Sequence, residues 1–540
     1  MPTLSSLDLA IVFCYLVGMT LFGVWFTRKQ KDLRTYFVGD RNVGWFLVLM
    51  SIVATETSAV TFLSVPGVAF NPKGGNLTYL QLSFGYIVGR CLVAWLLLPL
   101  YMQGNLFSAY EVLRQRFGPS VQRVASAIFL LTRTVADGLR LFLTALIMQF
   151  VLTPYFPDSE RERIDASIVL VGIVTIIYTY LGGMKAVLWT DLIQFVIKVL
   201  GAVLAGVFVL KLLPGGADQV LMESREAGKL TLFDFQHAFD PTVPFNFWAG
   251  LIGGAVFSMA SHGADQMMVQ RYLCARSLGQ ARLALVLSGF VVTVQFALFL
   301  FVGLGMWTLM HAGLFPEAAG RRTDEVFGLF IVSRLPVGIV GLLVAAVLAA
   351  AMSTLASSLN SSANALVTDF YKPLRPGRGE GHYVTRSRIL TAVWGVAQMG
   401  VAMLAYRFGG DKSIVEQVLK VAGLTTGLLL GLFVLGSLPW KIESRAALIG
   451  LLAGFVVVLG LWLPEGIGAF AKSIPDDPHH RMLAGMVVPR GMTQAVIAWP
   501  WFALIGAGTT TLVGLLANFG RSKTAVTSPH NPPNLQENPG

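Results

Sequence analysis

The chain has 540 residues, of which 55% are hydrophobic and 13% are charged. The charged share is about half that of ordinary soluble proteins. It is too small to cover the surface of a soluble protein of this length, so the composition indicates a polytopic membrane protein. The formal net charge is +11. Basic cytoplasmic loops explain this charge, so we expect the lipid bilayer as a partner and no nucleic acid.

Apolar segments follow one another along almost the whole chain. A helix needs about 20 apolar residues to cross a hydrocarbon core. We count thirteen such segments, at residues 7–27, 43–70, 78–102, 122–153, 164–182, 187–212, 246–271, 282–311, 329–370, 384–406, 413–437, 444–463 and 493–519. The sequence therefore predicts an all-α polytopic membrane protein with about 13 transmembrane helices.

The distribution of lysine and arginine predicts an orientation in the membrane. Loops 28–41 and 371–388 carry both lysine and arginine, and loop 271–282 carries three arginines; all three loops fall on one side when thirteen helices alternate. The long loops 213–245 and 464–492 fall on the other side and hold few basic residues for their length. The positive-inside rule then predicts a multi-pass protein of the plasma membrane, with the N-terminus outside and the C-terminus in the cytoplasm.

Small and hydroxyl-bearing residues interrupt the apolar segment 329–370, in the stretch AAAMSTLASSLNSSANA. On a helix, spacings of three, four and seven place on one face Ala350, Ser353, Thr354, Ser357 and Ser361. One interpretation is packing between helices, in which each hydroxyl bonds its own backbone. The other is a cation site of hydroxyl and carbonyl oxygens, which suits Na⁺.

A second polar cluster lies in the segment MSIVATETSAVTFLSVPGVAF, from Met50 to Phe70. Glu56 lies inside this apolar segment, where an acid is costly and usually functional. The small and hydroxyl residues from Ala54 to Ser58 predict an unwound stretch with freed carbonyls, as in the broken helices of secondary transporters. Pro66-Gly67 is an alternative place for the helix simply to end.

Charged residues also cluster in LLTRTVADGLRLF, where Arg133, Asp137 and Arg140 share a helix face and leave one positive charge over. They form either a structural triad or an arginine clamp for a substrate carboxylate. Asp191 follows the turn at Gly182-Gly183, and it is either a helix N-terminal acid favoured by the dipole or a stop on an ion's exit path. His262 is either a hydrogen-bonded structural residue or a proton relay.

Four motifs in combination resemble those of the sodium:solute symporter family: ATETSAVTFLSVPG, LGGMKAVLWTD, ADQMMVQRYL and AAAMSTLASSLNSSANALVTDFYKP. The resemblance covers residues 7–463 and implies a leucine-transporter-like core of two inverted five-helix repeats. The implied parts are a leading helix at 1–30 and repeats at 43–212 and 246–437. The apolar segments that follow predict two additional helices at 444–519, and the polar, Pro-rich end of the sequence predicts a disordered cytoplasmic tail at 520–540.

The resemblance also implies ion sites. The main Na⁺ site of such proteins corresponds to the carbonyls of Ala54, Thr57 and Ala350 with the hydroxyls of Ser353 and Thr354. Asp191 and Ser357 match the second Na⁺ site that some members carry. Ala356 stands where two-sodium members can have another hydroxyl, so one or two ions per cycle are both open.

The solute is predicted less directly. Arg133 falls near the carboxylate-binding arginine of sialic-acid-transporting members, which favours a small organic anion. The segment LVLSGFVVTVQF lacks the lysine of sugar-transporting members, which disfavours a glucose-type solute. The substrate-binding candidates are Glu56, Ser58, Gln81, Arg133, Arg140 and His262.

The predicted function is import of a small organic solute together with Na⁺, by alternating access. Alternatives are proton coupling through Glu56 or His262, a sugar or vitamin as solute, a membrane-embedded enzyme, and a sensor. We expect no enzyme, because the sequence holds no HExxH motif, no acidic metal pair and no catalytic triad.

Overall fold

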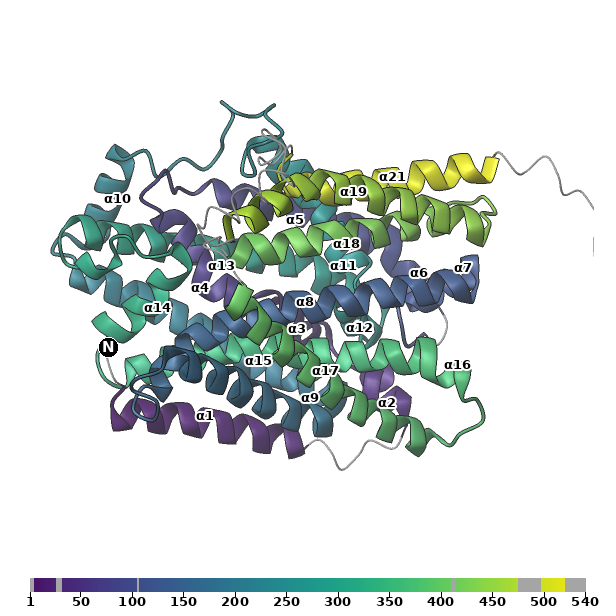
Figure 1. Ribbon diagram of the computed structural model, residues 1–540, viewed down its shortest axis with the longest axis horizontal. Helices are drawn as coiled ribbons and strands as arrows, with labels where there is room; N and C mark the ends of the chain where they lie inside the picture. The colour runs from purple at the N-terminus through teal and green to yellow at the C-terminus, as the bar shows by residue number, and fades with distance from the viewer. Residues whose placement is uncertain (1–3, 26–31, 104–105, 409–413, 474–496, 520–540) are drawn as a thin grey trace, which may run out of the picture.

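The computed structural model describes residues 4–25, 32–103, 106–408, 414–473 and 497–519. Its long helices lie side by side along the longest axis of the molecule (Figure 1). In chain order the helices are α1 (Ser6–Trp25), α2 (Leu33–Val38), α3 (Trp45–Glu56), α4 (Ala59–Phe70), α5 (Gln81–Leu92), α6 (Leu98–Met102), α7 (Tyr110–Phe117), α8 (Pro119–Leu152), α9 (Glu160–Leu212), α10 (Gly216–Glu226), α11 (Gly254–Gly263), α12 (Gln266–Leu273), α13 (Leu278–His311), α14 (Thr323–Arg334), α15 (Ile339–Leu366), α16 (Lys372–Leu374), α17 (Glu380–Phe408), α18 (Ile414–Ser437), α19 (Ser444–Ser473) and α21 (Pro500–Phe519).

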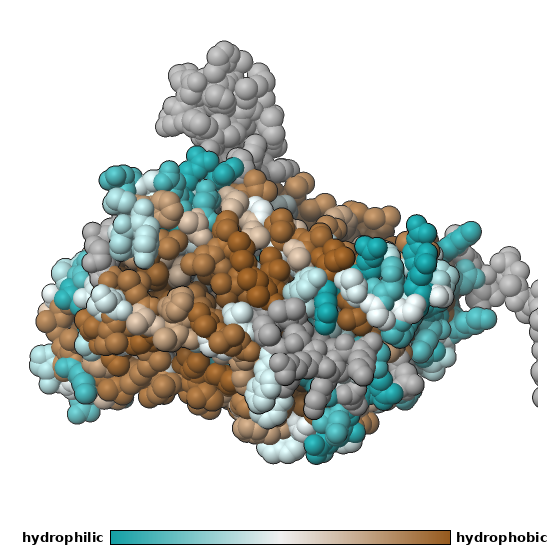
Figure 2. Space-filling model, turned by 90° about the horizontal axis from the view of Figure 1, so that it is seen from below, coloured by the Kyte–Doolittle hydropathy of each residue, from teal (hydrophilic) through white to brown (hydrophobic). Residues whose placement is uncertain are grey.

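The fold class is all-α, as predicted. Among the described residues, ten helices are long and apolar enough to cross a membrane, and the bent pair α3–α4 makes eleven. The predicted segments 164–182 and 246–271 are also helical but are not among these eleven. Apolar side chains cover the middle of the face that carries α1, and hydrophilic ones gather toward its ends (Figure 2). The predicted tail at 520–540 lies outside the described residues.

The predicted break in the second apolar segment is confirmed. Helix α3 ends at Glu56, α4 begins at Ala59, and their axes differ by 62°. Thr57 and Ser58 join them in non-helical conformations, with ψ of 75° and 175°, and only Ser58 is extended. The alternative end at Pro66-Gly67 is wrong, because α4 continues through both residues to Phe70.

Two other interruptions shape the bundle. Gly183 kinks α9 with a φ of 58°, which a residue without a β-carbon adopts at little cost. The chain also breaks between α11 and α12, where the Asp265 side chain accepts a hydrogen bond from the Met267 amide and caps α12. The described core thus contains two interrupted helices, α3–α4 and α11–α12.

Lys229 anchors the far end of α4. Its Nζ lies 3.0 Å from the Ala69 carbonyl, 3.0 Å from that of Asn71 and 2.7 Å from that of Gly75. The ammonium also lies 4.9 Å from the centre of the Trp307 ring. Carbonyls at a helix C-terminus lack helical donors and carry partial negative charge, so a buried ammonium satisfies them well. The segment 213–245 therefore holds the C-terminal end of α4 in place.

We expect Lys229→Met to destabilise the protein by about 2 kcal/mol, because three carbonyls lose a charged donor while the side-chain volume is kept. Thermal unfolding of the purified protein in detergent measures this effect. Lys73→Met removes an exposed lysine near the same helix end and serves as the control. Equal melting temperatures for the two variants would contradict the anchoring role.

Candidate ion and substrate site

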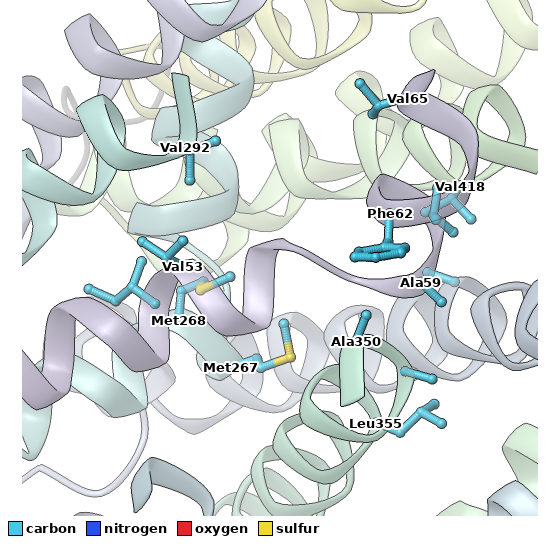
Figure 3. Close-up of a cluster of buried hydrophobic side chains, with 14 of the residues drawn as sticks. Val53, Ala59, Phe62, Val65, Met267, Met268, Val292, Ala350, Leu355 and Val418 are labelled. Carbon is cyan, nitrogen blue, oxygen red and sulfur yellow. The ribbon is translucent and has the colours of Figure 1, made fainter. Parts of the chain in front are cut away.

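The break between α3 and α4 frees backbone carbonyls inside the bundle, and side chains from two other helices bind them. Lys198 of α9 places its Nζ 2.5 Å from the Ala54 oxygen and 3.1 Å from the Thr57 oxygen. Thr354 of α15 donates its hydroxyl to the Thr55 carbonyl at 2.9 Å. Figure 3 shows Ala350 of α15 beside the extended segment that joins α3 to α4. The break is therefore a meeting point of α3, α9 and α15.

The five residues predicted for the main Na⁺ site lie around this meeting point. The Thr354 hydroxyl is 3.3 Å from the Ala350 carbonyl, and the Ser353 hydroxyl donates to Asp191 Oδ1 at 2.7 Å. Ala54, Ala350 and Ser353 are fully buried, and Thr354 is 1% exposed. Oxygens of the kind that bind hard cations therefore gather here. The two α3 carbonyls among them already contact the Lys198 ammonium.

Asp191 and Ser357, predicted for a second Na⁺, lie around a buried arginine. Asp191 Oδ2 accepts from the Ser51 hydroxyl at 2.5 Å and from Arg271 Nη2 at 3.2 Å. The same guanidinium donates to the hydroxyls of Thr55 and Ser357. This position thus also holds a basic side chain.

The proposed dipole role of Asp191 is not supported by its position. It lies about two helical turns beyond the kink at Gly183, whereas the dipole acts mainly within the first turn. Its carboxylate faces α3, α12 and α15 instead, through Ser51, Arg271 and Ser353. Asp191 therefore links α9 to α3, α12 and α15.

Glu56 forms an ion pair that the sequence analysis did not anticipate. Arg90 of α5 holds both carboxylate oxygens, at 2.6 and 2.5 Å, and donates to the Ser288 hydroxyl at 2.6 Å. His262 lies close by, with Nε2 3.7 Å from Glu56 Oε2 and Nδ1 3.0 Å from the Ser261 hydroxyl. The cost of an acid in an apolar segment is therefore offset by a buried arginine.

The arginines of α8 are balanced by acids. Arg140 pairs with Asp137, and Arg133 Nη1 lies 3.9 Å from the same carboxylate. Arg133 also pairs with Asp265, the residue that caps α12. The predicted left-over positive charge is wrong, because Asp265 supplies the second negative charge. Arg133 therefore already faces two carboxylates, those of Asp137 and Asp265.

Two further substrate candidates, Gln81 and Ser58, lie where their contacts are with the protein itself. The Gln81 amide nitrogen donates to the carbonyls of Thr78 and Phe245 at 3.1 and 2.8 Å, and its oxygen accepts from the Asp234 amide at 3.2 Å. Gln81 thus ties the loop 213–245 to α5. Ser58 is 4% exposed and occupies the N-cap position just before α4, where its side chain forms no capping hydrogen bond.

Sequence reasoning missed three basic residues at the centre of the site: Arg90, Lys198 and Arg271. Each interrupts an apolar stretch, as in IVGRCL, FVIKVL and MVQRYL. A charge inside an apolar segment marks a functional position by default. Applying that rule to bases as well as to acids would have found all three.

Comparisons with known proteins show the family to which the chain belongs. The model of the sodium:solute symporter family matches residues 36–454. The sodium/sialic acid symporter NanT of Aliivibrio fischeri is 30% identical over 461 residues, which cover 84% of this chain and 87% of that protein. The human sodium/iodide cotransporter is 30% identical over 489 residues, which cover 87% of this chain and 72% of that protein.

Solved structures give the same result. A Na⁺-coupled sialic acid symporter in a substrate-bound outward-open state matches with a TM-score of 0.80 at 25% identity, over 96% of this chain and 98% of that one. A nucleobase-cation-symport-1 family transporter in a closed conformation matches with a TM-score of 0.53 at 14% identity, over 91% and 95% of the two chains, and shows the fold alone. Both confirm the leucine-transporter-like fold class. The chain belongs to the sodium:solute symporter family, in which Na⁺ is the coupling ion.

Proposed function

We propose that the protein is a symporter that uses Na⁺ to import a small organic anion by alternating access. The observation that carries this proposal is the convergence of buried carbonyl and hydroxyl oxygens from α3 and α15 at the break, beside Asp191 of α9. Such oxygen sets at a broken helix suit a hard cation. The named solutes of several relatives support the anion: sialic acid, iodide and monocarboxylates.

In this proposal Na⁺ is held by the carbonyls of Ala54, Thr57 and Ala350 with the hydroxyls of Ser353 and Thr354. A second Na⁺ would use Asp191 and Ser357. A cation between α3 and α15 stabilises the arrangement in which both helices face it. If that arrangement is also the one that binds solute, the two ligands increase each other's affinity by the same factor.

The solute is proposed to bind beside the ion, where six candidates provide polar contacts: Glu56, Ser58, Gln81, Arg133, Arg140 and His262. Arg133 presents a planar fork that matches a carboxylate, and a solute carboxylate would take the place of Asp265. Because Asp265 caps α12, this exchange would link solute binding to the position of α12.

The proposed orientation places the basic loops in the cytoplasm and the N-terminus outside. The inside-negative membrane potential then favours inward movement of Na⁺, by about 2.3 kcal/mol per charge per 100 mV. The Na⁺ gradient and this potential together would drive uptake.

We expect the double variant Ser353→Ala with Thr354→Ala to lose most Na⁺-driven uptake in proteoliposomes, because it removes two proposed ligands and the bond from α15 to the Thr55 carbonyl. The control is Thr175→Ala with Thr179→Ala, two buried hydroxyls that donate only to carbonyls of their own helix α9. Uptake in the Ser353/Thr354 variant equal to the control would overturn the site.

For the solute, we expect Arg133→Lys to raise the KM for an anion about tenfold, because lysine keeps the charge but loses the fork. Asp265→Asn should lower the KM, since it removes the competing carboxylate. Uptake of labelled sialic acid and of a short monocarboxylate measures both effects. Arg334→Lys, in an outlying pair with Glu317, is the control. An unchanged KM in both test variants would exclude Arg133 as the clamp.

A further inference from the structure

The side chain of Lys198 ends where the proposed Na⁺ site begins. Its Nζ lies 2.5 Å from the Ala54 carbonyl oxygen and 3.1 Å from that of Thr57, and the residue is fully buried. These two oxygens are the whole α3 contribution to the proposed site. The Lys198 ammonium therefore contacts two of the oxygens that are proposed to bind the transported Na⁺.

No acid contacts this buried charge directly among the residues that the structure describes. Within the described ranges, no carboxylate lies at salt-bridge distance from Lys198. The acid nearest in sequence on its own helix, Asp191, lies seven residues earlier, about 10 Å along the axis. Asp191 is engaged instead by Arg271 and Ser353. The Lys198 ammonium is thus stabilised by backbone carbonyl dipoles, as a bound metal ion would be.

Lys198 and Na⁺ cannot both use these carbonyls. Each cation needs the same oxygen lone pairs, and two positive charges a few ångströms apart in a buried site repel each other strongly. The flexible four-carbon stem of lysine allows the ammonium to withdraw without movement of the helix. At any moment these carbonyls therefore bind either the Lys198 ammonium or Na⁺, but not both.

We propose that Lys198 is a tethered cation that competes with Na⁺ for the carbonyls of Ala54 and Thr57 and thereby sets the Na⁺ affinity of this site. The inference rests on the proposed Na⁺ site and goes beyond it. Na⁺ enters when Lys198 withdraws, and the returning ammonium helps to expel the ion. Lys198 acts as a positioning and selectivity residue at the ion site.

The test is direct Na⁺ binding to the purified full-length protein in detergent. Thermal stability is measured against increasing NaCl, with choline chloride keeping the ionic strength constant. We expect Lys198→Met to lower the NaCl concentration for half-maximal stabilisation about tenfold or more, because the competing charge is gone. Lys198→Gln, which keeps a donor for one carbonyl, guards against a folding failure of Lys198→Met and should show a similar gain. Lys198→Arg keeps the charge and should show no gain.

The control is Lys211→Met, near the end of the same helix, where the ammonium lies 5.6 Å from the centre of the Phe208 ring. Combining Lys198→Gln with Thr354→Ala should remove the gained Na⁺ response, which assigns it to this site. An unchanged or weaker Na⁺ response in both neutral variants would overturn the inference. If the wild type shows no Na⁺ response and Lys198→Gln gains one, the inference holds and Na⁺ coupling of the wild type fails.

Discussion

The interruption between α3 and α4 is the constraint on which the rest of the site depends. A helix that stops inside an apolar bundle leaves carbonyls without amide partners, and no water is present in a bilayer core to satisfy them. Here the Lys198 ammonium and the Thr354 hydroxyl take the place of those amides. Helices α9 and α15 are therefore held at the break through the same backbone carbonyls that the proposed cation site would use.

Two buried ion pairs near the break are compensated locally, whereas Lys198 contacts backbone carbonyls. Glu56 faces Arg90, and Arg133 faces Asp265. Each pair joins two helices that are far apart in sequence, so it also fixes how those helices pack. Breaking one partner of such a pair leaves an uncompensated buried charge, which is strongly destabilising. When the protein changes conformation, each of these buried charges must therefore gain a new partner as it leaves the old one.

Local features of the site were predictable from sequence, whereas its pairings were not. Thr, Glu and Ser inside an apolar segment predicted the break, and the spacing of Ser353 and Thr354 predicted the helix face that meets it. Periodicity cannot show that Lys198 reaches a carbonyl 144 residues earlier in the chain. Apolar segment lengths predicted the all-α membrane-spanning class, and the family motifs predicted the leucine-transporter-like core. The balance of the α8 arginines depended on Asp265, which the sequence suggested only as part of a family motif.

A cation fixed to the protein differs from a free one in that it never crosses the membrane. Lys198 and Arg271 bring two basic groups to the proposed site and Asp191 brings one acidic group, so the site with a protonated Lys198 carries one positive charge over. When access to that site alternates, this charge moves through part of the electric field even with nothing bound. The reorientation of the unloaded carrier is then voltage-dependent, and an inside-negative potential slows its return to the outward-facing state.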